Sequence, residues 1–345
     1  MDPSWSYVAG QGVLADARLS QYQGRRALVT GGLGFIGSNV ARALVALGCE
    51  VRVVDSMRDG QGGNLFNLED LKSEIDIRVA DVRDQDMVNE AVQGCDFVFH
   101  IAGTGSHLDS LEDPFNDMEL NVKGSLCVLE AVRHHAPEAH LVYAGTRSEY
   151  GLIQTRPVSE THPLLPTEAN SVHKAAASLY QIAYHQAYGL HTCSLRLPNV
   201  YGPRMLTRHH RIGFINWFVK LAVDGGTFRL YGDGGQVRDM LYVDDLVLAF
   251  LLAAVTPQAA GDVFNVGSGE PSSLAAITQE LVRIAGRGKV EFVPFPEEAK
   301  RIEIGDYVAD IEKIRDCLGW RPQVSLCDGL ERTVRYYEAY KEHYV

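Results

Sequence analysis

No run of apolar residues in this 345-residue chain is long enough to span a bilayer, which takes about 20 residues. The most apolar window, Leu241 to Val255, is interrupted by Asp244 and Asp245. The first residues, MDPSWSYVAG, hold an acid and no apolar segment after a basic start, so they do not match a secretory signal. We therefore expect a cytoplasmic protein with no membrane partner.

Basic residues are also scarce, because 32 Lys and Arg stand against 44 Asp and Glu and leave a net charge of −12. A surface this acidic repels a phosphate backbone, so we expect no nucleic-acid partner. Hydrophobic residues make up 46% and charged residues 22%, which is typical of soluble globular proteins and excludes disordered, collagen-like and coiled-coil classes. The length predicts roughly two domains, or one large α/β unit with an appendage.

Cysteine pairs of the C-x-x-C type are absent. The six cysteines lie in apolar or helical contexts, at Cys49, Cys95, Cys127, Cys193, Cys317 and Cys327. This usage suits reduced thiols in a cytosol better than a disulfide framework or a zinc site. Neighbours on a helix, such as His134 and His135, point about 100° apart, so we expect no metal site.

Short apolar runs alternate with helical patterns over the first half of the chain. The strand-like segments are 26–30, 51–55, 77–80, 97–101 and 141–144. The helix-like segments are 35–47, 84–92 and about 115–134. Strands that alternate with helices predict an α/β fold, a Rossmann-type doubly wound parallel sheet covered on both faces.

The pattern loosens after Leu195, where glycines and prolines become frequent. We expect a leader over residues 1–24, a sheet domain over 25–196, and a smaller C-terminal domain over most of 197–345. Residues 241–266 are compact enough to return to the main sheet, so the boundary is interleaved. The leader has no assigned role, and it either frays or covers a dimer edge.

A glycine-rich turn joins the first strand to the first helix and reads T-G-G-L-G-F-I-G. It contains Gly31, Gly34 and Gly37, with Phe35 and Ile36 between them at the start of the helix. Such glycines let the backbone approach a pyrophosphate, which then lies at the positive end of the helix. A turn in this context predicts a dinucleotide site.

Acidic residues at the ends of the next two strands refine this prediction. Asp55 follows the turn by about 20 residues, and its carboxylate accepts ribose hydroxyls and repels a 2′-phosphate, which favours NAD. Arg58 lies close to Asp55 in the sequence, so NADP remains the alternative cofactor. Asp81 and Val82 follow the third strand and are placed to meet the adenine edge, although an acid there also serves as a helix cap.

Several further motifs extend along almost the whole chain from Arg26. They are H-I-A-G at 100–103, N-V-K-G at 121–124, L-P-N-V-Y-G-P-R at 197–204, L-Y-G-D-G-G-Q-V-R-D-M-L-Y-V-D-D at 230–245, F-N-V-G-S-G-E at 264–270 and L-G-W-R-P at 318–322. Together they resemble the extended short-chain dehydrogenase/reductase family, specifically its nucleotide-sugar epimerases and dehydratases of the UDP-glucose 4-epimerase type. The resemblance implies NAD in the sheet domain, a nucleoside-diphosphate sugar between the domains, and a homodimer.

The same resemblance implies a set of substrate contacts. Asn199 would contact the sugar diphosphate, Tyr231 the nucleobase and Arg238 the diphosphate, while Ser106, Arg147 and Asp306 complete the predicted substrate site. An aromatic face suits a flat base, and a guanidinium fork suits phosphate oxygens. Where many members have Arg-x-Gly-Asp this chain reads Glu303, Ile304, Gly305, Asp306. Either Arg301 supplies the missing charge or the nucleotide end is bound differently.

The family's chemistry is transient oxidation, in which a Tyr four residues before a Lys removes a hydroxyl proton and a Thr shares the hydrogen bond. Thr146 and Lys174 match, and Lys174 is expected to bind the cofactor as well, but Asn170 stands where the Tyr belongs. An amide cannot take a proton, so Asn170 can only orient a hydroxyl. The candidates for proton transfer are His107, His173 and Glu149.

The leading hypothesis is an NAD-dependent isomerase or oxidoreductase acting on a nucleoside-diphosphate sugar, with 4-epimerisation through a proton relay that lacks tyrosine. Arg147 and Ser148 stand where dehydratases carry an acidic pair, which argues against a 4,6-dehydratase. Decarboxylation, dehydration or net ketone reduction of the same substrate class remain alternatives. A non-catalytic sugar-nucleotide-binding protein is the alternative from a different class.

Overall fold

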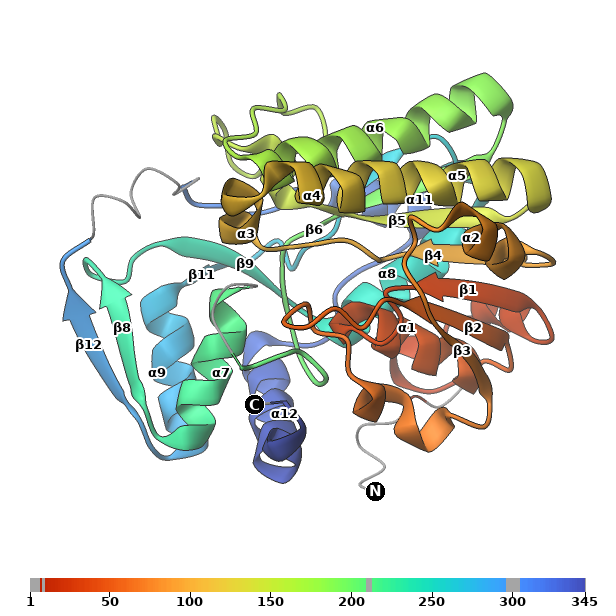
Figure 1. The fold of residues 1–345 in the computed structure, drawn as a ribbon. Helices are drawn as coiled ribbons and strands as arrows, with labels where there is room; N and C mark the ends of the chain where they lie inside the picture. The colour runs from red at the N-terminus through yellow and green to blue at the C-terminus, as the bar shows by residue number, and fades with distance from the viewer. Residues whose placement is uncertain (1–6, 8–9, 209–212, 296–304, 345) are drawn as a thin grey trace.

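The fold is built around a seven-stranded parallel sheet with the strand order β10-β6-β5-β4-β1-β2-β3 (Figure 1). The computed structural model describes residues 7, 10–208, 213–295 and 305–344. The strand order reverses between β1 and β4, as in doubly wound dinucleotide-binding folds. The predicted Rossmann-type α/β fold is therefore confirmed.

The first five strands of the sheet start and end close to the predicted positions, and β6 and β10 complete it. Their bounds are β1 Arg26–Thr30, β2 Glu50–Asp55, β3 Ile75–Val79, β4 Phe97–His100, β5 His140–Thr146, β6 His191–Leu197 and β10 Val263–Asn265. Most of them are buried continuous apolar runs, as expected for parallel strands covered on both faces. The late strand β10 pairs with β6, so residues from beyond position 260 join the main sheet.

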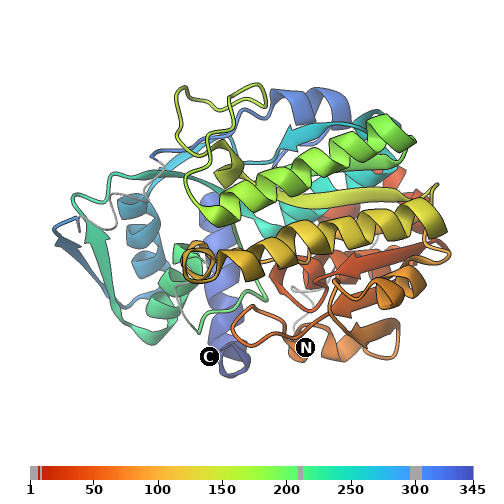
Figure 2. The same cartoon turned by 45° about the horizontal axis from the view of Figure 1, so that its top comes forward.

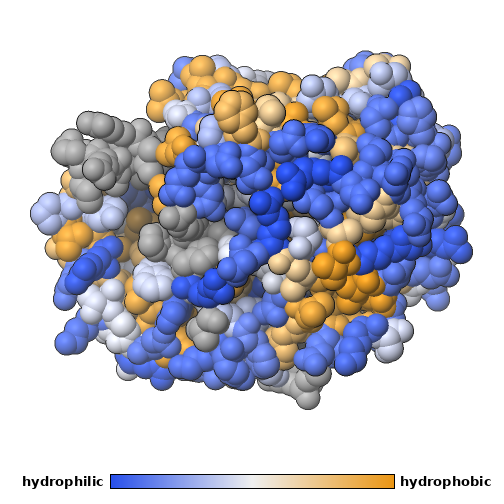
Figure 3. All heavy atoms as spheres, viewed as in Figure 1, coloured by the Kyte–Doolittle hydropathy of each residue, from blue (hydrophilic) through white to orange (hydrophobic). Residues whose placement is uncertain are grey.

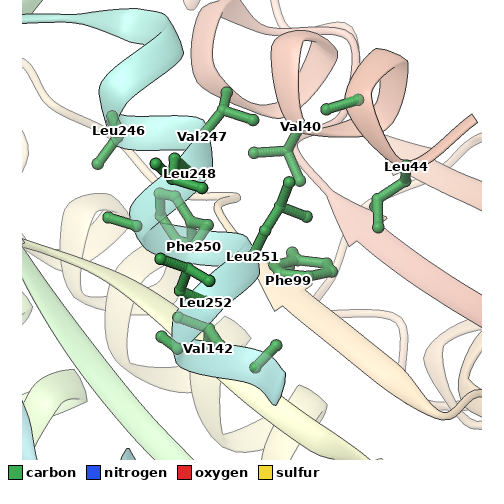
Figure 4. Packing of buried hydrophobic residues seen from close by; sticks show 14 of the residues in the cluster. Val40, Leu44, Phe99, Val142, Leu246, Val247, Leu248, Phe250, Leu251 and Leu252 are labelled. Carbon is green, nitrogen blue, oxygen red and sulfur yellow. The ribbon is translucent and has the colours of Figure 1, made fainter. Parts of the chain in front are cut away.

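Helices cover both faces of this sheet. On one face lie α1 Phe35–Ala46 and α8 Val243–Val255, and on the other lie α2 Gln85–Val92, α5 Gly124–His135 and α6 Ala169–Tyr188. Figure 2 shows α5 and α6 running side by side. Figure 4 shows Leu251 of α8 between Val40 of α1 and Phe99 of β4, within the same buried cluster as Phe250. Almost every residue of α8 is buried, which explains why residues 243–255 read as the most apolar window.

The single long helix expected over residues 115–134 is wrong in one respect. The segment consists of α4 Pro114–Met118, a π-helical turn Glu119–Lys123 and α5. At the turn the side chain of Asn121 bonds to Thr104, accepting from its N–H at 3.1 Å and donating to its Oγ1 at 2.8 Å. Such turns occur often at functional sites, and apolar periodicity alone does not reveal them.

The described part of the leader packs against the sheet domain. Leu14, Leu19 and Tyr22 are buried in the main core, and the Tyr22 hydroxyl donates to the carbonyl of Leu251 at 2.8 Å. Tyr7 donates to the Asp244 carboxylate at 2.8 Å. The expectation that the leader frays is therefore wrong for these residues, while residues 1–6, 8 and 9 lie outside the described part.

The C-terminal part of the chain builds a second, smaller core. It contains a three-stranded sheet of β11 Pro271–Ser273, β9 Val237–Tyr242 and β7 Asn199–Tyr201, and a pair of β12 Lys289–Val293 and β8 Thr227–Tyr231. Around them lie α7 Phe214–Asp224, α9 Leu274–Ala285 and α12 Leu326–Tyr340, while α11 Glu312–Leu318 contacts β10. The short helix α3 His107–Glu112 follows β4. None of the described helices is long and apolar enough to cross a membrane.

Candidate cofactor and substrate site

A cavity of about 230 Å³ opens at the carboxyl ends of β1, β2 and β4, where the strand order reverses. This is the place at which doubly wound sheets bind their ligands. Eight of the residues expected to bind the cofactor line it: Gly31, Gly34, Phe35, Ile36, Gly37, Asp55, Asp81 and Val82. The structure thus brings together residues that span more than 50 positions of sequence.

Two glycines of the first turn are required by close backbone contacts. Gly31 has φ +68°, and a Cβ there would lie 2.8 Å from the backbone N of Ala102. A Cβ on Gly37 would collide with the carbonyl oxygen of Gly31. The turn therefore leaves open a cradle that any larger residue would fill, directly before the N-terminus of α1.

The two acidic residues of the cavity differ in their surroundings. Asp55 accepts the N–H groups of Leu33 at 3.0 Å and Met57 at 2.9 Å, and its burial raises the pKa of its carboxyl. Its position at the end of β2 suits ribose hydroxyl donors. Asp81 instead pairs with Arg83 at 2.7 Å, and this hydrogen bond lowers the pKa of Asp81.

Sequence reasoning did not select several other residues that line the cavity, among them Gln61, Gly63, Ile101 and Thr104. Gln61 and Gly63 follow Asp55 in a glycine-containing loop, and Thr104 follows the H-I-A-G motif, so position after a strand was the available signal. Arg58 also lines the cavity, and its Nη1 is buried without a hydrogen bond to any described residue.

Lys174 reaches toward the cavity from α6. Its Nζ donates to the carbonyl of Ala144 at 2.7 Å and lies 4.6 Å from the centre of the Tyr143 ring. A Cβ on Gly103, which lines the cavity, would lie 3.6 Å from this Nζ. Burial lowers the pKa of Lys174 to about 8.

Thr146 lies at the end of β5, where its Oγ1 accepts the N–H of Ser148 at 3.2 Å. Its own N–H donates to Glu149 at 2.9 Å. Glu149 is fully buried and paired with Arg196 at 2.8 Å. The Glu149 carboxylate is thus occupied by protein partners, and its role in proton transfer stays a prediction.

Asn170 lies in the first turn of α6, and its side chain is directed at α4 and the loop after β4. Its Nδ2 donates to the Thr104 carbonyl at 3.0 Å and to Asp117 Oδ2 at 3.0 Å, and it lies 3.2 Å from Thr104 Oγ1. The residue is 2% exposed. The amide is thus fixed within a polar network, and it cannot act as a base.

The two candidate histidines have different partners. His107 is the first residue of α3 and is half exposed, with Nδ1 2.8 Å from the Glu168 carboxylate. Glu168 caps the N-terminus of α6, and although burial opposes it, the hydrogen bonds from His107 and Ser171 lower its pKa to about 2. The ring of His173 is largely buried, with Nδ1 2.7 Å from Asp117 Oδ1. His107 therefore supports the start of α6, whereas His173 joins the network around Asn170.

The predicted substrate residues near the sheet lie in three places. Ser106 is buried and caps α3 by accepting the N–H of Asp109 at 3.1 Å. The guanidinium carbon of Arg147 lies 5.4 Å from the centre of the Tyr307 ring. Asn199 Oδ1 is buried and accepts no hydrogen bond from the described residues, so it is available to a substrate donor.

The predicted contacts to the nucleotide and diphosphate lie farther toward the C-terminal part. Tyr231 is 40% exposed, and its ring lies 5.2 Å from that of Phe295. Arg238 donates to the Val237 carbonyl at 2.9 Å. Asp306 accepts the Val237 N–H at 2.8 Å and pairs with Arg156 at 2.5 Å, so its carboxylate is occupied by protein partners. Residues 301, 303 and 304 lie outside the described part of the chain.

The topology, the glycine turn and the carboxylate at the end of β2 define a Rossmann-type dinucleotide-binding enzyme. Residues 27–267 match the model of the NAD dependent epimerase/dehydratase family, and the chain belongs to that family. This assignment confirms the resemblance drawn from the motifs.

Individual relatives align over nearly the whole chain. The UDP-glucose 4-epimerase of Mycolicibacterium smegmatis is 31% identical over 90% of this chain and 98% of its own. The structure of UDP-glucose 4-epimerase from Thermotoga maritima, solved with UDP-glucose, superposes with a TM-score of 0.83 at 30% identity, covering 91% of this chain and 99% of the other. The dTDP-glucose 4,6-dehydratase of Streptomyces venezuelae, solved with NAD, gives 0.83 at 32% identity, covering 92% and 98%.

NAD is the cofactor, and the family to which the chain belongs comprises NAD-dependent nucleotide-sugar epimerases, dehydratases and decarboxylases. The residues present fit this cofactor. The cradle at Gly31 and Gly37 admits a pyrophosphate, and Asp55 lies where ribose hydroxyls donate.

Proposed function

We propose that this protein is a 4-epimerase of a nucleoside-diphosphate sugar that transfers its proton without a tyrosine. The observation that carries the proposal is the position of Lys174, whose buried Nζ lies behind Gly103 at the rim of the NAD cavity. A binding protein gains little from a buried ammonium with a lowered pKa, whereas a hydroxyl that loses its proton is stabilised by one.

NAD, when bound, accepts a hydride from the sugar carbon and later returns it. The chain's own residues do the remaining work. Lys174 places a positive charge beside the reacting oxygen, and the hydroxyl of Thr146 donates a hydrogen bond to it. Arg147 and Ser148 replace the acids that dehydration requires, which supports epimerisation over water loss.

The nucleotide end of the substrate is proposed to lie over the C-terminal part. Arg238 neutralises the diphosphate, Tyr231 offers its exposed face to the base, and Asn199 accepts a hydroxyl donor through its buried Oδ1. Ser106 and Arg147 are proposed to face the sugar. Asp306 is proposed to act through Arg156, which it holds at 2.5 Å.

A sugar acid is the second candidate substrate, and Arg147 is the observation that favours it. Arg147 follows Thr146 in the chain, and its guanidinium lies against the ring of Tyr307. A guanidinium in that position suits a carboxylate on the sugar. Oxidation of a hydroxyl at the carbon β to the carboxylate would then allow CO₂ to leave, so the product would be a decarboxylated sugar.

The proposal is tested on the purified protein. Bound nucleotide is released and identified, and the protein is then mixed with UDP-, dTDP-, GDP- and CDP-sugars while nicotinamide absorbance and sugar products are followed. Bound NAD with a C4-inverted product supports the epimerase, and CO₂ release from a uronic acid supports the second candidate. Neither reduction nor product from any donor contradicts both and supports a binding protein.

We also propose that the protein forms a homodimer through α3, α4 and α6. These helices carry exposed apolar side chains at Leu108, Leu111, Phe115, Met118, Val172 and Leu179. Apolar groups gather on the upper part of the molecule in Figure 3, where α6 lies in Figure 1. An apolar surface of this kind marks an interaction site, and a second copy would bury it against itself.

The six cysteines form no disulfide, which supports a reducing compartment such as the cytoplasm.

A further inference from the structure

Asp117 gathers three hydrogen-bond donors beside the position of the missing tyrosine. The hydroxyl of Thr104 donates to Oδ2 at 2.5 Å, and Asn170 Nδ2 donates to the same oxygen at 3.0 Å. His173 Nδ1 lies 2.7 Å from Oδ1. Asp117 is 3% exposed, and these donors satisfy the oxygens of a carboxylate that is buried away from water.

Thr104 connects this carboxylate to the NAD cavity, which it lines. Asn121 fixes it, because its Oδ1 accepts the Thr104 N–H at 3.1 Å and its Nδ2 donates to Oγ1 at 2.8 Å. A threonine hydroxyl has one proton and two lone pairs. Asn121 donates to the oxygen, so the proton of Thr104 points to Asp117. Asn170 Nδ2 also lies 3.2 Å from this oxygen, but its two protons are directed to the Thr104 carbonyl and to Asp117 at 3.0 Å each. One lone pair of Oγ1 is therefore left to accept from a substrate hydroxyl.

His173 completes the network on the side away from the cavity. A carboxylate only accepts, so the Nδ1 of His173 donates its proton to Asp117 Oδ1. The ring is 15% exposed, so the network reaches from the cavity to the edge of α6. The sequence offered His173 as one of three candidates, and the structure links it to the cavity through Asp117 and Thr104.

We propose that Thr104, Asp117 and His173 form the proton relay that takes the place of the missing tyrosine, an inference that rests on the proposed function. A sugar hydroxyl gives its proton to Thr104 Oγ1 as the proton of Thr104 passes to Asp117 Oδ2. The electron pair of the broken O–H bond forms the C=O bond, and the hydrogen on that carbon leaves with its electron pair to the oxidised nicotinamide. The steps reverse when the sugar is reduced.

Asn170 is a positioning residue in this arrangement. Its amide donates to Asp117 and to the Thr104 carbonyl, so it holds the two members of the relay together. A tyrosine at this position would supply its own hydroxyl as the base, and the donors to Asp117 would be reduced by one. In this proposal the asparagine at position 170 and the Thr104–Asp117 contact therefore act together.

A purely structural role is the competing explanation, since Asp117 also ties α4 to α6 through His173. The variants Thr104→Val and Thr104→Ser separate the two explanations. Valine keeps the shape of threonine and removes the hydroxyl, whereas serine keeps the hydroxyl and loses a methyl group. Packing around Thr104 is weakened by both changes, but the hydroxyl is lost only in the valine variant. A valine variant that loses its rate while its melting temperature and NAD affinity are kept indicates a relay, whereas a loss of melting temperature indicates a structural contact.

The experiment measures nicotinamide reduction in a single turnover of the NAD-loaded enzyme with a sugar nucleotide that the wild type converts, from pH 5.5 to 9.5. We expect Thr104→Val and Asp117→Asn to lower this rate by roughly 10² to 10⁴-fold, with NAD affinity and KM little changed. Thr104→Ser should stay within about tenfold of the wild type.

Asp70→Asn is the control for losing an ion-paired carboxylate elsewhere in the sheet domain. Asp70 pairs with Arg42 at 2.6 Å in the sheet domain and is not part of the site. This variant should lower the melting temperature and leave the single-turnover rate unchanged. If Asp117→Asn fails to fold, the pair at Thr104 still decides the question.

The outcomes separate the relay from the proposed function. Wild type that turns over, with Thr104→Val within about threefold of it, overturns the relay and leaves the epimerase standing. Equal losses in Thr104→Val and Thr104→Ser also overturn it, because they indicate a packing role. Wild type that reduces no nicotinamide with any donor overturns the proposed function itself, and the relay with it.

Discussion

The ammonium of Lys174 lies 4.6 Å from the centre of the Tyr143 ring. The position four residues before Lys174, where a tyrosine base was expected, is occupied by Asn170. Tyr143 does not take over that task, since it is completely buried in the core of the sheet and burial raises the pKa of its hydroxyl far above the usual value. The Tyr143 ring instead stabilises the positive charge of Lys174 through a cation–π contact.

Lys174→Met is expected to abolish transient oxidation, because it removes this charge and keeps the length of the side chain. We expect the rate of nicotinamide reduction to fall by roughly 10²-fold or more. In the wild type the charged form is lost as the pH rises through about 8, so the rate should fall above that pH, and Lys174→Met should show no such limb. Lys220→Met on α7 is the control, and a loss of activity there would point to a general effect.

The glycine turn predicts a sharp difference between two alanine variants. In Gly37→Ala the new Cβ meets the Gly31 carbonyl, whereas in Gly34→Ala it lies 3.3 Å from the same oxygen at a permitted φ of −77°. We expect Gly37→Ala to lower the free energy of unfolding by about 3 kcal/mol and to lose bound NAD, and Gly34→Ala to cost about 1 kcal/mol. Urea unfolding and nucleotide content measure both, and equal stability of the two variants would contradict the geometry.

Most of the sheet domain was readable from the sequence, because its signals are local. A buried parallel strand is a short apolar run, and the turn from β1 to α1 has glycines where backbone atoms approach closely. Asp55 follows from the same logic, since the end of the second strand adjoins that turn. These residues lie at the ends of consecutive strands, so their order along the chain was enough to predict that they meet in space.

The network around Asp117 was not readable, because its contacts join distant segments. Asn170 and His173 meet an aspartate 53 and 56 residues earlier in the chain, and the π-helical turn shifts Asn121 out of the helical register. Sequence reasoning placed His107 ahead of His173, but His107 pairs with the helix-capping Glu168. Only the packing of α4 against α6 shows which histidine belongs with Asn170.

Phe115→Asp is expected to dissociate the proposed homodimer. Phe115 is 77% exposed on α4, and a charge at that position opposes burial against a second copy. Light scattering on a sizing column should show a dimer for the wild type and a monomer for the variant. Phe292→Asp, at a residue 56% exposed on β12, is the matched control and should remain dimeric. A monomeric wild type at micromolar concentration would rule the dimer out.

His100 gives stability a defined dependence on pH. It is fully buried between Thr30 Oγ1 at 2.8 Å and Ser125 Oγ at 3.0 Å, and burial together with the charge of Lys174 lowers its pKa to about 3. Between pH 6.5 and 3 the unfolded chain therefore takes up a proton that the folded protein refuses, so stability is complete above pH 6.5 and falls below it.

The variant His100→Gln removes this titration and keeps a polar side chain. Between pH 7.5 and 5.5 the free energy of unfolding of the wild type should fall by about 1.4 kcal/mol more than that of the variant. Urea unfolding at both pH values measures the difference, and the other titrating groups cancel because both proteins contain them. Equal slopes in the two proteins would mean that His100 titrates at the same pH in the folded and the unfolded chain, which would contradict the lowered pKa.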